Sequence, residues 1–182
     1  MLNTPNPPLV HSVSYDEFED QLGPDFMRRG DEEFMKAGVR GLTILFASGD
    51  FGTGCNASSL PAKFAPEWPP SSPYITSVGG TSSPSAIHVG LRTEAAWAMS
   101  GGGFSYYAPQ PSYQASAVAV YIKNTQGPPP AKFFDPSNRG FPDVAAWATL
   151  PPQSTRSCSK GRLQAFPARA HPPRRGRAYL VS

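Results

Sequence analysis

The sequence has few cysteines, no long apolar run and no cluster of metal-binding residues. Among its 182 residues only Cys55 and Cys158 are cysteines, too few for a disulfide framework. No run approaches the ~18 apolar residues that span a membrane. His11, His88 and His171 are scattered, without the spacing of metal ligands. These absences exclude a disulfide-rich scaffold and argue against a membrane span and a histidine-based metal site.

Acidic residues are missing from one end of the chain. Residues 1–147 contain 9 Lys or Arg and all 13 Asp or Glu, whereas residues 148–182 contain 7 Lys or Arg and no acid. The net charge of +3 and the pI near 9.0 therefore reflect the second stretch. We expect 148–182 to be a basic, Pro- and Arg-rich tail, disordered or out of frame. Its Arg-rich cluster at 174–177 raises nucleic-acid binding as an alternative, which we rank last.

Several common functional signals do not occur. The first residues contain neither a basic segment nor an apolar core of about 7–15 residues, so they do not resemble a secretory signal. The glycines at 49, 52 and 54 have the spacing of neither a dinucleotide fingerprint nor a phosphate-binding loop. No G-x-S-x-G nucleophile elbow is present. Asn56 begins the one glycosylation sequon, a weak motif.

Apolar periodicity predicts alternating helices and strands. In Asp25–Val39, apolar residues and two glycines recur at a spacing of three to four, which predicts a helix if another element packs closely on the glycines. Leu42–Ala47 is a continuous apolar run, typical of a strand covered on both faces. A helix followed by such a strand favours an α/β fold with a parallel sheet. The other expected elements are a strand at Val10–Tyr15, a strand at Tyr74–Val78 closed by glycines, a hairpin of Ile87–Leu91 and Glu94–Met99, a flexible turn at Ser100–Ser105, a helix at Ser112–Ile122, a loop at Gly127–Pro130 and a buried strand at Phe141–Ala146.

A run of small residues follows the predicted strand Leu42–Ala47. It reads Ser48-Gly49-Asp50, and the carboxyl ends of parallel strands are where α/β folds place binding and chemistry. An aspartate in such a turn more often only caps the loop. Asp50 is therefore a candidate functional residue.

Six segments, taken together, resemble one family. They are VHSVSY (10–15), ASGDFGTGC (47–55), SSPYITSVGGTS (71–82), SGGGFS (100–105), PSYQ (111–114) and FPDVAA (141–146). Over roughly residues 2–147 the chain resembles the sedolisins, the serine-carboxyl peptidases, and among them the lysosomal tripeptidyl-peptidases. The resemblance implies a subtilisin-like parallel sheet with helices on both faces, incomplete at both ends.

The resemblance implies a serine-type peptidase that acts on peptides at acid pH. In this family a serine in a Ser-Gly-Thr-Ser motif is the nucleophile, a glutamate is its base, and an aspartate matching Asp50 lines the oxyanion hole. A protonated carboxyl donates a hydrogen bond to the oxyanion, a contribution worth roughly 3–4 kcal/mol. Ser14 and Tyr15 match the strand that pairs with the peptide backbone. The family's usual glycine after that tyrosine is Asp16 here, which alters the cleft.

The resemblance also implies which groups this chain lacks. The family's glutamate and its aspartate partner would precede Val10, and no Ser-Gly-Thr-Ser follows Ala146. The family binds calcium, but its ligand loop is absent, as is the cysteine expected to pair with Cys55. We therefore expect 1–147 to be a partial peptidase domain that is inactive alone, with a lysosomal location for the family. The alternative is a non-enzymatic truncated isoform that binds peptide or a partner through exposed sheet edges.

Overall fold

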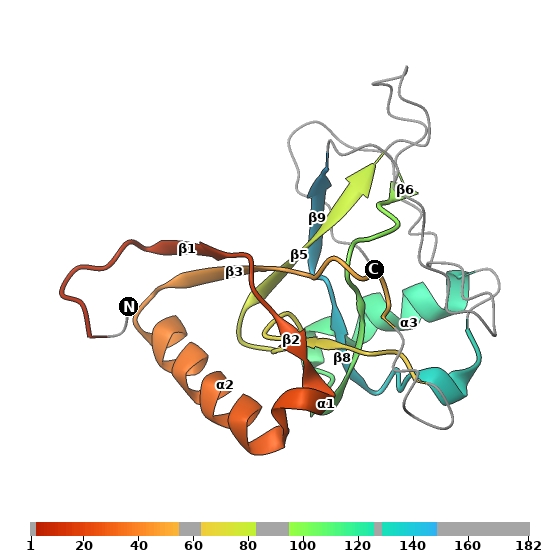
Figure 1. Cartoon of the computed structure of the whole chain (residues 1–182), viewed down its shortest axis with the longest axis horizontal. Helices are drawn as coiled ribbons and strands as arrows, with labels where there is room; N and C mark the ends of the chain where they lie inside the picture. Colours follow the sequence, from red (N-terminus) through yellow and green to blue (C-terminus); the bar gives the residue numbers. More distant parts are fainter. Residues whose placement is uncertain (1–2, 55–62, 83–94, 126–128, 149–182) are drawn as a thin grey trace.

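The computed structural model describes residues 3–54, 63–82, 95–125 and 129–148. Their centre is a five-stranded sheet in the order β1-β3-β5-β6, with β9 also beside β5 (Figure 1). The strands β1, β3, β5 and β9 run parallel, and β6 runs antiparallel to β5. These strands are β1 (Val10–Val13), β3 (Thr43–Ala47), β5 (Thr76–Ser82), β6 (Ala95–Ala96) and β9 (Val144–Trp147). The predicted α/β class with a parallel sheet is confirmed.

Two small antiparallel sheets and the helices flank this centre. One small sheet pairs β2 with β4 and the other pairs β7 with β8. Their strands are β2 (Glu17–Phe18), β4 (Glu67–Trp68), β7 (Gly103–Pro109) and β8 (Asn138–Phe141). The helices are α1 (Glu19–Leu22), α2 (Pro24–Val39) and α3 (Ala115–Asn124), with the 3-10 turns η1 (Ser112–Gln114) and η2 (Ala131–Phe133). None of the helices in the described ranges is long and apolar enough to cross a membrane.

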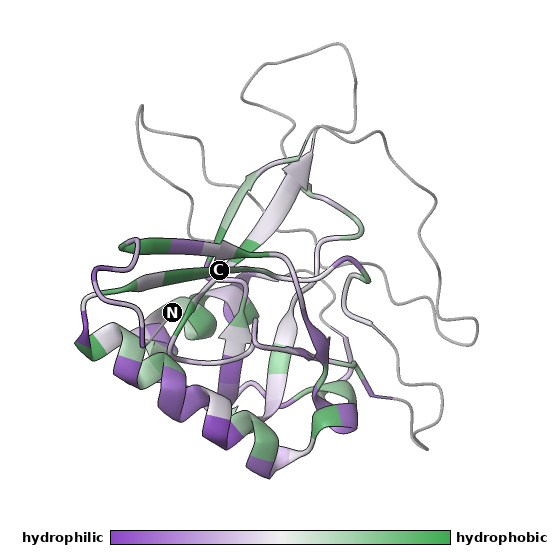
Figure 2. Ribbon diagram, turned by 60° about the vertical axis from the view of Figure 1, so that its left-hand side comes forward, coloured by the Kyte–Doolittle hydropathy of each residue, from purple (hydrophilic) through white to green (hydrophobic). Residues whose placement is uncertain are grey.

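Helix α2 covers one face of the parallel sheet, as its periodicity predicts. Ala37 of α2 is buried in one cluster with Ile44 and Phe46 of β3, and hydrophilic and hydrophobic residues alternate along the helix in Figure 2. Gly30 has the close neighbour that the prediction requires, because a Cβ there would lie 2.4 Å from the indole ring of Trp68, whereas a Cβ on Gly38 would meet nothing within 4 Å. The helix ends at Val39, before a glycine with a positive φ at position 41.

Strand β3 is less enclosed than its continuous apolar run predicts. Ile44 and Phe46 are buried, whereas Leu45 and Ala47 are only half-buried and Thr43 is exposed. The expectation of full cover on both faces is therefore wrong. This alternation leaves one face of the strand in the core and the other partly open.

Two other expectations are wrong because tertiary packing overrides local propensity. The glycines at 79 and 80 do not close a strand but lie inside β5, where they pair with β9. A Cβ on Gly79 would meet Pro142 at 2.7 Å, so the close packing itself requires the missing side chain. The expected flexible turn at Ser100–Ser105 becomes strand β7 from Gly103 onward.

The remaining expected elements agree in part. Ser112–Ile122 forms η1 and α3, and the strand expected at Val10–Tyr15 ends at Val13. The strand expected at Phe141–Ala146 is divided, because Phe141 ends β8 and Val144 begins β9. The expected hairpin arm Ile87–Leu91, the start of the loop Gly127–Pro130, Cys55, Asn56, Cys158 and the tail lie outside the described residues.

Candidate active site

The Ser48-Gly49-Asp50 turn leaves the sheet at the carboxyl end of β3, as the sequence predicts. Ser48 is buried and its amide donates to the carbonyl of Val78 at 2.9 Å. Asp50, in contrast, is exposed. The sheet therefore anchors one end of the turn and presents the carboxyl group of Asp50 to solvent.

Residues 100 and 101 hold the turn from one side. The amide of Gly101 donates to the carbonyl of Gly49 at 2.8 Å, and the hydroxyls of Ser48 and Ser100 lie 3.3 Å apart. A Cβ on Gly101 would lie 1.7 Å from the Ser48 carbonyl oxygen. The ASGDFGTGC and SGGGFS segments are thus in direct backbone contact, which explains why Gly101 has no side chain.

Glu67 of β4 lies against the turn from another side. A Cβ on Gly49 would be 1.6 Å from Oε2 of Glu67. Gly49 also has a φ of +102°, which disfavours any residue with a side chain. Glu67 is only 3% exposed, so its carboxyl group packs directly on the backbone of Gly49.

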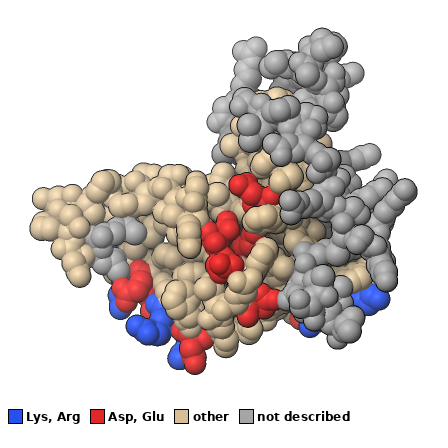
Figure 3. All heavy atoms as spheres, viewed as in Figure 1, with Lys and Arg blue, Asp and Glu red and all other residues tan. Residues whose placement is uncertain are grey.

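Four carboxylates lie around this turn, and no Lys or Arg of the described residues pairs with them. They belong to Asp16, Glu17, Asp50 and Glu67, and Figure 3 shows acidic side chains over β2 and the end of β3 with the Lys and Arg residues elsewhere. Within the described ranges, no ion pair joins any of them to a basic residue. Burial first, and then Asp16, Asp50 and Glu17, raise the pKa of Glu67 to about 8. Burial also raises the pKa of Asp16, with Asp50 and Glu17 adding to the rise.

Ser14 and Tyr15 follow β1 at the same edge of the sheet. Val13, the last residue of β1, is in register with Phe46 in the parallel strand β3, so the two chains leave the sheet side by side. Both predicted peptide-binding residues are exposed, Tyr15 to 73%. The structure therefore brings the predicted peptide-binding segment to the edge that carries Asp50.

Glu19 is a second buried glutamate, and its carboxyl group accepts hydrogen bonds from neighbouring segments. It is 1% exposed and accepts hydrogen bonds from the hydroxyls of Ser71 at 2.5 Å and Ser105 at 2.7 Å and from the amide of Tyr106 at 2.7 Å. Burial raises the pKa of Glu19, and these hydrogen bonds oppose the rise. Glu19 thereby joins α1 to the SSPYITSVGGTS and SGGGFS segments.

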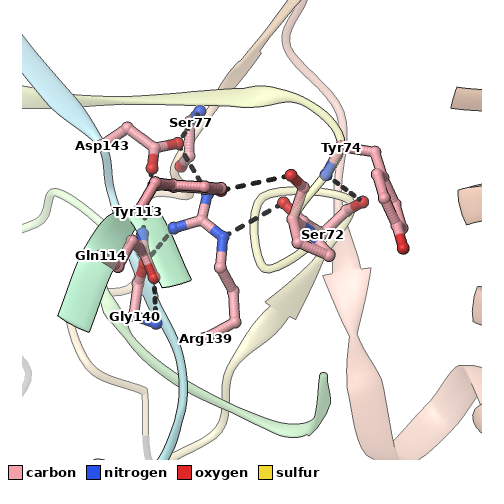
Figure 4. Close-up of polar contacts among 9 residues, drawn as sticks. Ser72, Tyr74, Ser77, Tyr113, Gln114, Arg139, Gly140 and Asp143 are labelled. Atoms are coloured by element: carbon pink, nitrogen blue, oxygen red, sulfur yellow. Dashed lines mark hydrogen bonds and ion pairs between the residues drawn. The ribbon is translucent and has the colours of Figure 1, made fainter. Parts of the chain in front are cut away.

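Three of the six segments meet around the fully buried Arg139 (Figure 4). Its guanidinium pairs with Asp143 at 2.6 Å and donates to the carbonyls of Ser72 and Gly140. Asp143 in turn accepts from the amide of Ser77 at 2.8 Å. Gln114 donates to Asp143 at 3.1 Å. These hydrogen bonds thus tie the SSPYITSVGGTS, PSYQ and FPDVAA segments together.

The described residues offer no cluster of side chains that fits a bound metal ion. In the part of the chain that the structure describes, no group of three or more His, Cys, Asp or Glu side chains could hold one. The carboxylates around Asp50 are therefore treated as acids and not as ligands, and no step of the chemistry below uses a metal.

Sequence reasoning missed both buried glutamates. Glu67 lies in a Pro- and Ser-rich stretch that reads as a loop, although it is the sole acid between Asp50 and Glu94. The lack of other acids nearby in the sequence is a signal that singles out Glu67. Glu19 carries no such signal, since it is one acid in the run Asp16–Asp20.

Comparison with known proteins shows which proteins this chain resembles. The chain is 51% identical over 139 residues to tripeptidyl-peptidase 1 of Rattus norvegicus and 47% identical to that of Homo sapiens, in each case over 76% of this chain and 24% of the relative. This chain is a homologue of the sedolisin family. Its fold matches that of Pseudomonas sedolisin, a serine-carboxyl proteinase complexed with two molecules of pseudo-iodotyrostatin, with a TM-score of 0.50 at 23% identity over 76% of this chain and 37% of that one. No family profile matches the chain.

The sedolisin homology confirms the resemblance that the six segments indicated. It also confirms the predicted subtilisin-like fold and supports the predicted resemblance to a family of serine-type peptidases. The chain spans about a quarter of the length of the tripeptidyl-peptidases it matches. The activity of the longer relatives is therefore carried to this chain only as a proposal.

Proposed function

We propose that this chain carries the oxyanion side of a serine-type peptidase site that acts on peptides at acid pH, as tripeptidyl-peptidases do. The observation that carries the proposal is the position of Asp50, exposed at the carboxyl end of a parallel strand beside the end of β1. The homology to tripeptidyl-peptidase 1 supports it. A lysosomal setting belongs to the same proposal, because acid pH favours a protonated carboxyl group.

In this proposal the peptide backbone lies along Ser14 and Tyr15, and the carbonyl under attack faces Asp50. The protonated carboxyl of Asp50 donates a hydrogen bond to the oxygen as negative charge develops on it. An ionised Asp50 would instead repel that oxygen. The same group therefore assists the reaction in acid and opposes it at higher pH.

The chain alone is proposed to bind peptide without hydrolysing it. No Ser-Gly-Thr-Ser motif occurs in the 182 residues, and oxyanion stabilisation without a nucleophile and base gives little turnover. The family's calcium forms no part of the proposal, since the described residues offer no group of ligands for it.

Binding of a peptide phosphinate tests the role of Asp50, because the probe carries an anionic tetrahedral centre like that of the transition state. We expect binding to strengthen towards acid pH and to weaken by about 10–100-fold in Asp50→Ala, the effect of one hydrogen bond to a charged group. Asp50→Asn keeps a donor and should retain the binding at all pH values. Asp25→Ala, a change of an exposed acid on α2, is the matched control. Equal binding by wild type and Asp50→Ala would contradict the proposal.

A specific observation favours the non-enzymatic alternative as a second candidate. Among the described strands β1 pairs only with β3, and its Val10 is 60% exposed. Such an edge can accept a peptide as an added strand. A peptide without a tetrahedral group should then shift the amide resonances of β1 equally in wild type and Asp50→Ala.

A further inference from the structure

Glu67 has the most unusual environment of any described side chain near the turn. Strand β4 places it there, because Phe18 of β2 is in register with Glu67 and the amide of Glu19 donates to the carbonyl of Pro66 at 3.0 Å. The backbone of Glu67 is also tied down, since its carbonyl accepts from the amide of Ser71 at 3.0 Å. These contacts fix the backbone from which the Glu67 side chain reaches Gly49.

Among the described residues, the charged and titratable groups that face Glu67 are all acids. Asp16 and Glu17 approach from the segment around β2, and Asp50 approaches from the turn after β3. Within the described ranges the carboxyl group of Glu67 has neither a hydrogen bond nor an ion pair. A negative charge on Glu67 would therefore be buried, unpaired and repelled.

A negative charge on Glu67 would disturb the contacts that hold the Ser48–Asp50 turn. On one side Gly101 donates to the Gly49 carbonyl at 2.8 Å, and just beyond the turn Gly52 donates to the Met99 carbonyl at 3.0 Å. On another side the turn rests on the carboxyl group of Glu67. The backbone of Gly49 is held between the two, and Asp50 is the next residue.

We propose that the protonated carboxyl group of Glu67 positions the Ser48–Asp50 turn and that ionisation of Glu67 releases it. Glu67 is then a positioning residue that acts through Gly49, not a group that touches the substrate. The consequence for catalysis rests on the proposed function of Asp50. The proton-dependent contact between Glu67 and the turn stands without it.

The proposal predicts that the Ser48–Asp50 turn is well ordered at acid pH and more mobile at basic pH. Burial and the acidic neighbours raise the pKa of Glu67 to about 8, so the carboxyl stays protonated at any pH at which a lysosomal peptidase would work. Asp16, whose pKa is also raised, titrates as part of the same coupled group. The turn would therefore hold Asp50 in a fixed place at acid pH.

The test is a carboxyl titration of the full chain with 13C-labelled glutamate, followed by NMR and assigned through the bonds of Glu67 itself. We expect this carboxyl to titrate near pH 8, in place of the ordinary 4.5. The amides of Gly101 and Gly52 should lose about tenfold or more of their exchange protection as Glu67 ionises, relative to amides of α2. Titration near the ordinary value would overturn the proposal.

Variants separate positioning from a merely structural role. In Glu67→Gln the side chain stays neutral, so the protection of Gly101 and Gly52 should no longer depend on pH. Glu33→Gln, a change of an exposed acid on α2, should leave the wild-type dependence intact. Should Glu67→Gln fail to fold, Glu67→Met offers another neutral side chain of similar length. A pH dependence that persists in the neutral variant would contradict the proposal, whatever the outcome with the phosphinate.

Discussion

Two glutamates of this chain are equally buried but meet opposite surroundings. Glu19 accepts three hydrogen bonds, from Ser71, Ser105 and Tyr106. Glu67 has only acids for charged neighbours and no donor among the described residues. Because a buried carboxylate is tolerated only where donors or cations compensate it, Glu19 can serve as a permanent structural centre. Glu67 is stable only with its proton, which makes it sensitive to pH.

Removal of Glu19 should have the largest effect on stability. Glu19→Ala leaves the hydroxyls of Ser71 and Ser105 and the amide of Tyr106 without their acceptor. Losing these bonds to a buried charged group should lower the free energy of unfolding by roughly 3–5 kcal/mol. Urea unfolding followed by circular dichroism measures it. Glu19→Gln, which keeps one acceptor, should lose less; an equal, small loss in Glu19→Ala and the surface variant Glu33→Ala would break the comparison.

The pH dependence of stability should come next in size. An acid with a raised pKa binds its proton more tightly in the folded chain, so its stabilising contribution is complete below the unfolded value of 4.5 and is lost as pH rises to about 8. The slope is about 1.4 kcal/mol per pH unit for one group, or roughly 3 kcal/mol from mildly acid to neutral conditions.

Unfolding titrations of wild type and Glu67→Gln at several pH values measure this slope. In Glu67→Gln the pH dependence of the unfolding free energy should lose the contribution of Glu67. A smaller slope of the same sign should remain, because burial also raises the pKa of Glu19 and of Asp16. If the unfolding free energy of Glu67→Gln depended on pH as steeply as that of wild type, the described difference between Glu19 and Glu67 would be contradicted.

The contact between Gly49 and Glu67 predicts a smaller, coupled effect. Gly49→Ala combines a strained φ with a Cβ placed 1.6 Å from Oε2 of Glu67, and it should cost roughly 2 kcal/mol. In a Glu67→Ala background the collision is gone and the strain remains, so the cost should fall by about 1 kcal/mol. A double-mutant cycle at acid pH gives the coupling. Strict additivity would mean that the carboxyl does not press on the turn.

Local pattern was sufficient to predict the elements that define the fold class. Helix α2 follows from the spacing of its apolar residues and strand β3 from its continuous apolar run, although β3 is less enclosed than that run predicts. The Ser48-Gly49-Asp50 turn follows from its place after an apolar strand. Asp50 was found because motif and position agree. Its role as an oxyanion donor stays a prediction, as do the peptide-binding roles of Ser14 and Tyr15.

The parts that sequence did not reveal depend on contacts between distant segments. Gly79 reads as a strand end, yet it lies inside β5 because Pro142 packs where its side chain would be. Strands β2 and β4 have two residues each, too short for any periodicity. Since those strands position Glu67, no local pattern could show that this acid lies beside Asp50.

Peptide hydrolysis at pH ~4, where the carboxyl group of Glu67 is expected to be protonated, tests the central claim most directly. The folded full chain is incubated with an unblocked peptide, and the products are followed by mass spectrometry. The account predicts that the peptide remains intact, because the chain holds the oxyanion side of the site without the family's serine motif. Release of tripeptides by wild type but not by Asp50→Ala would contradict it.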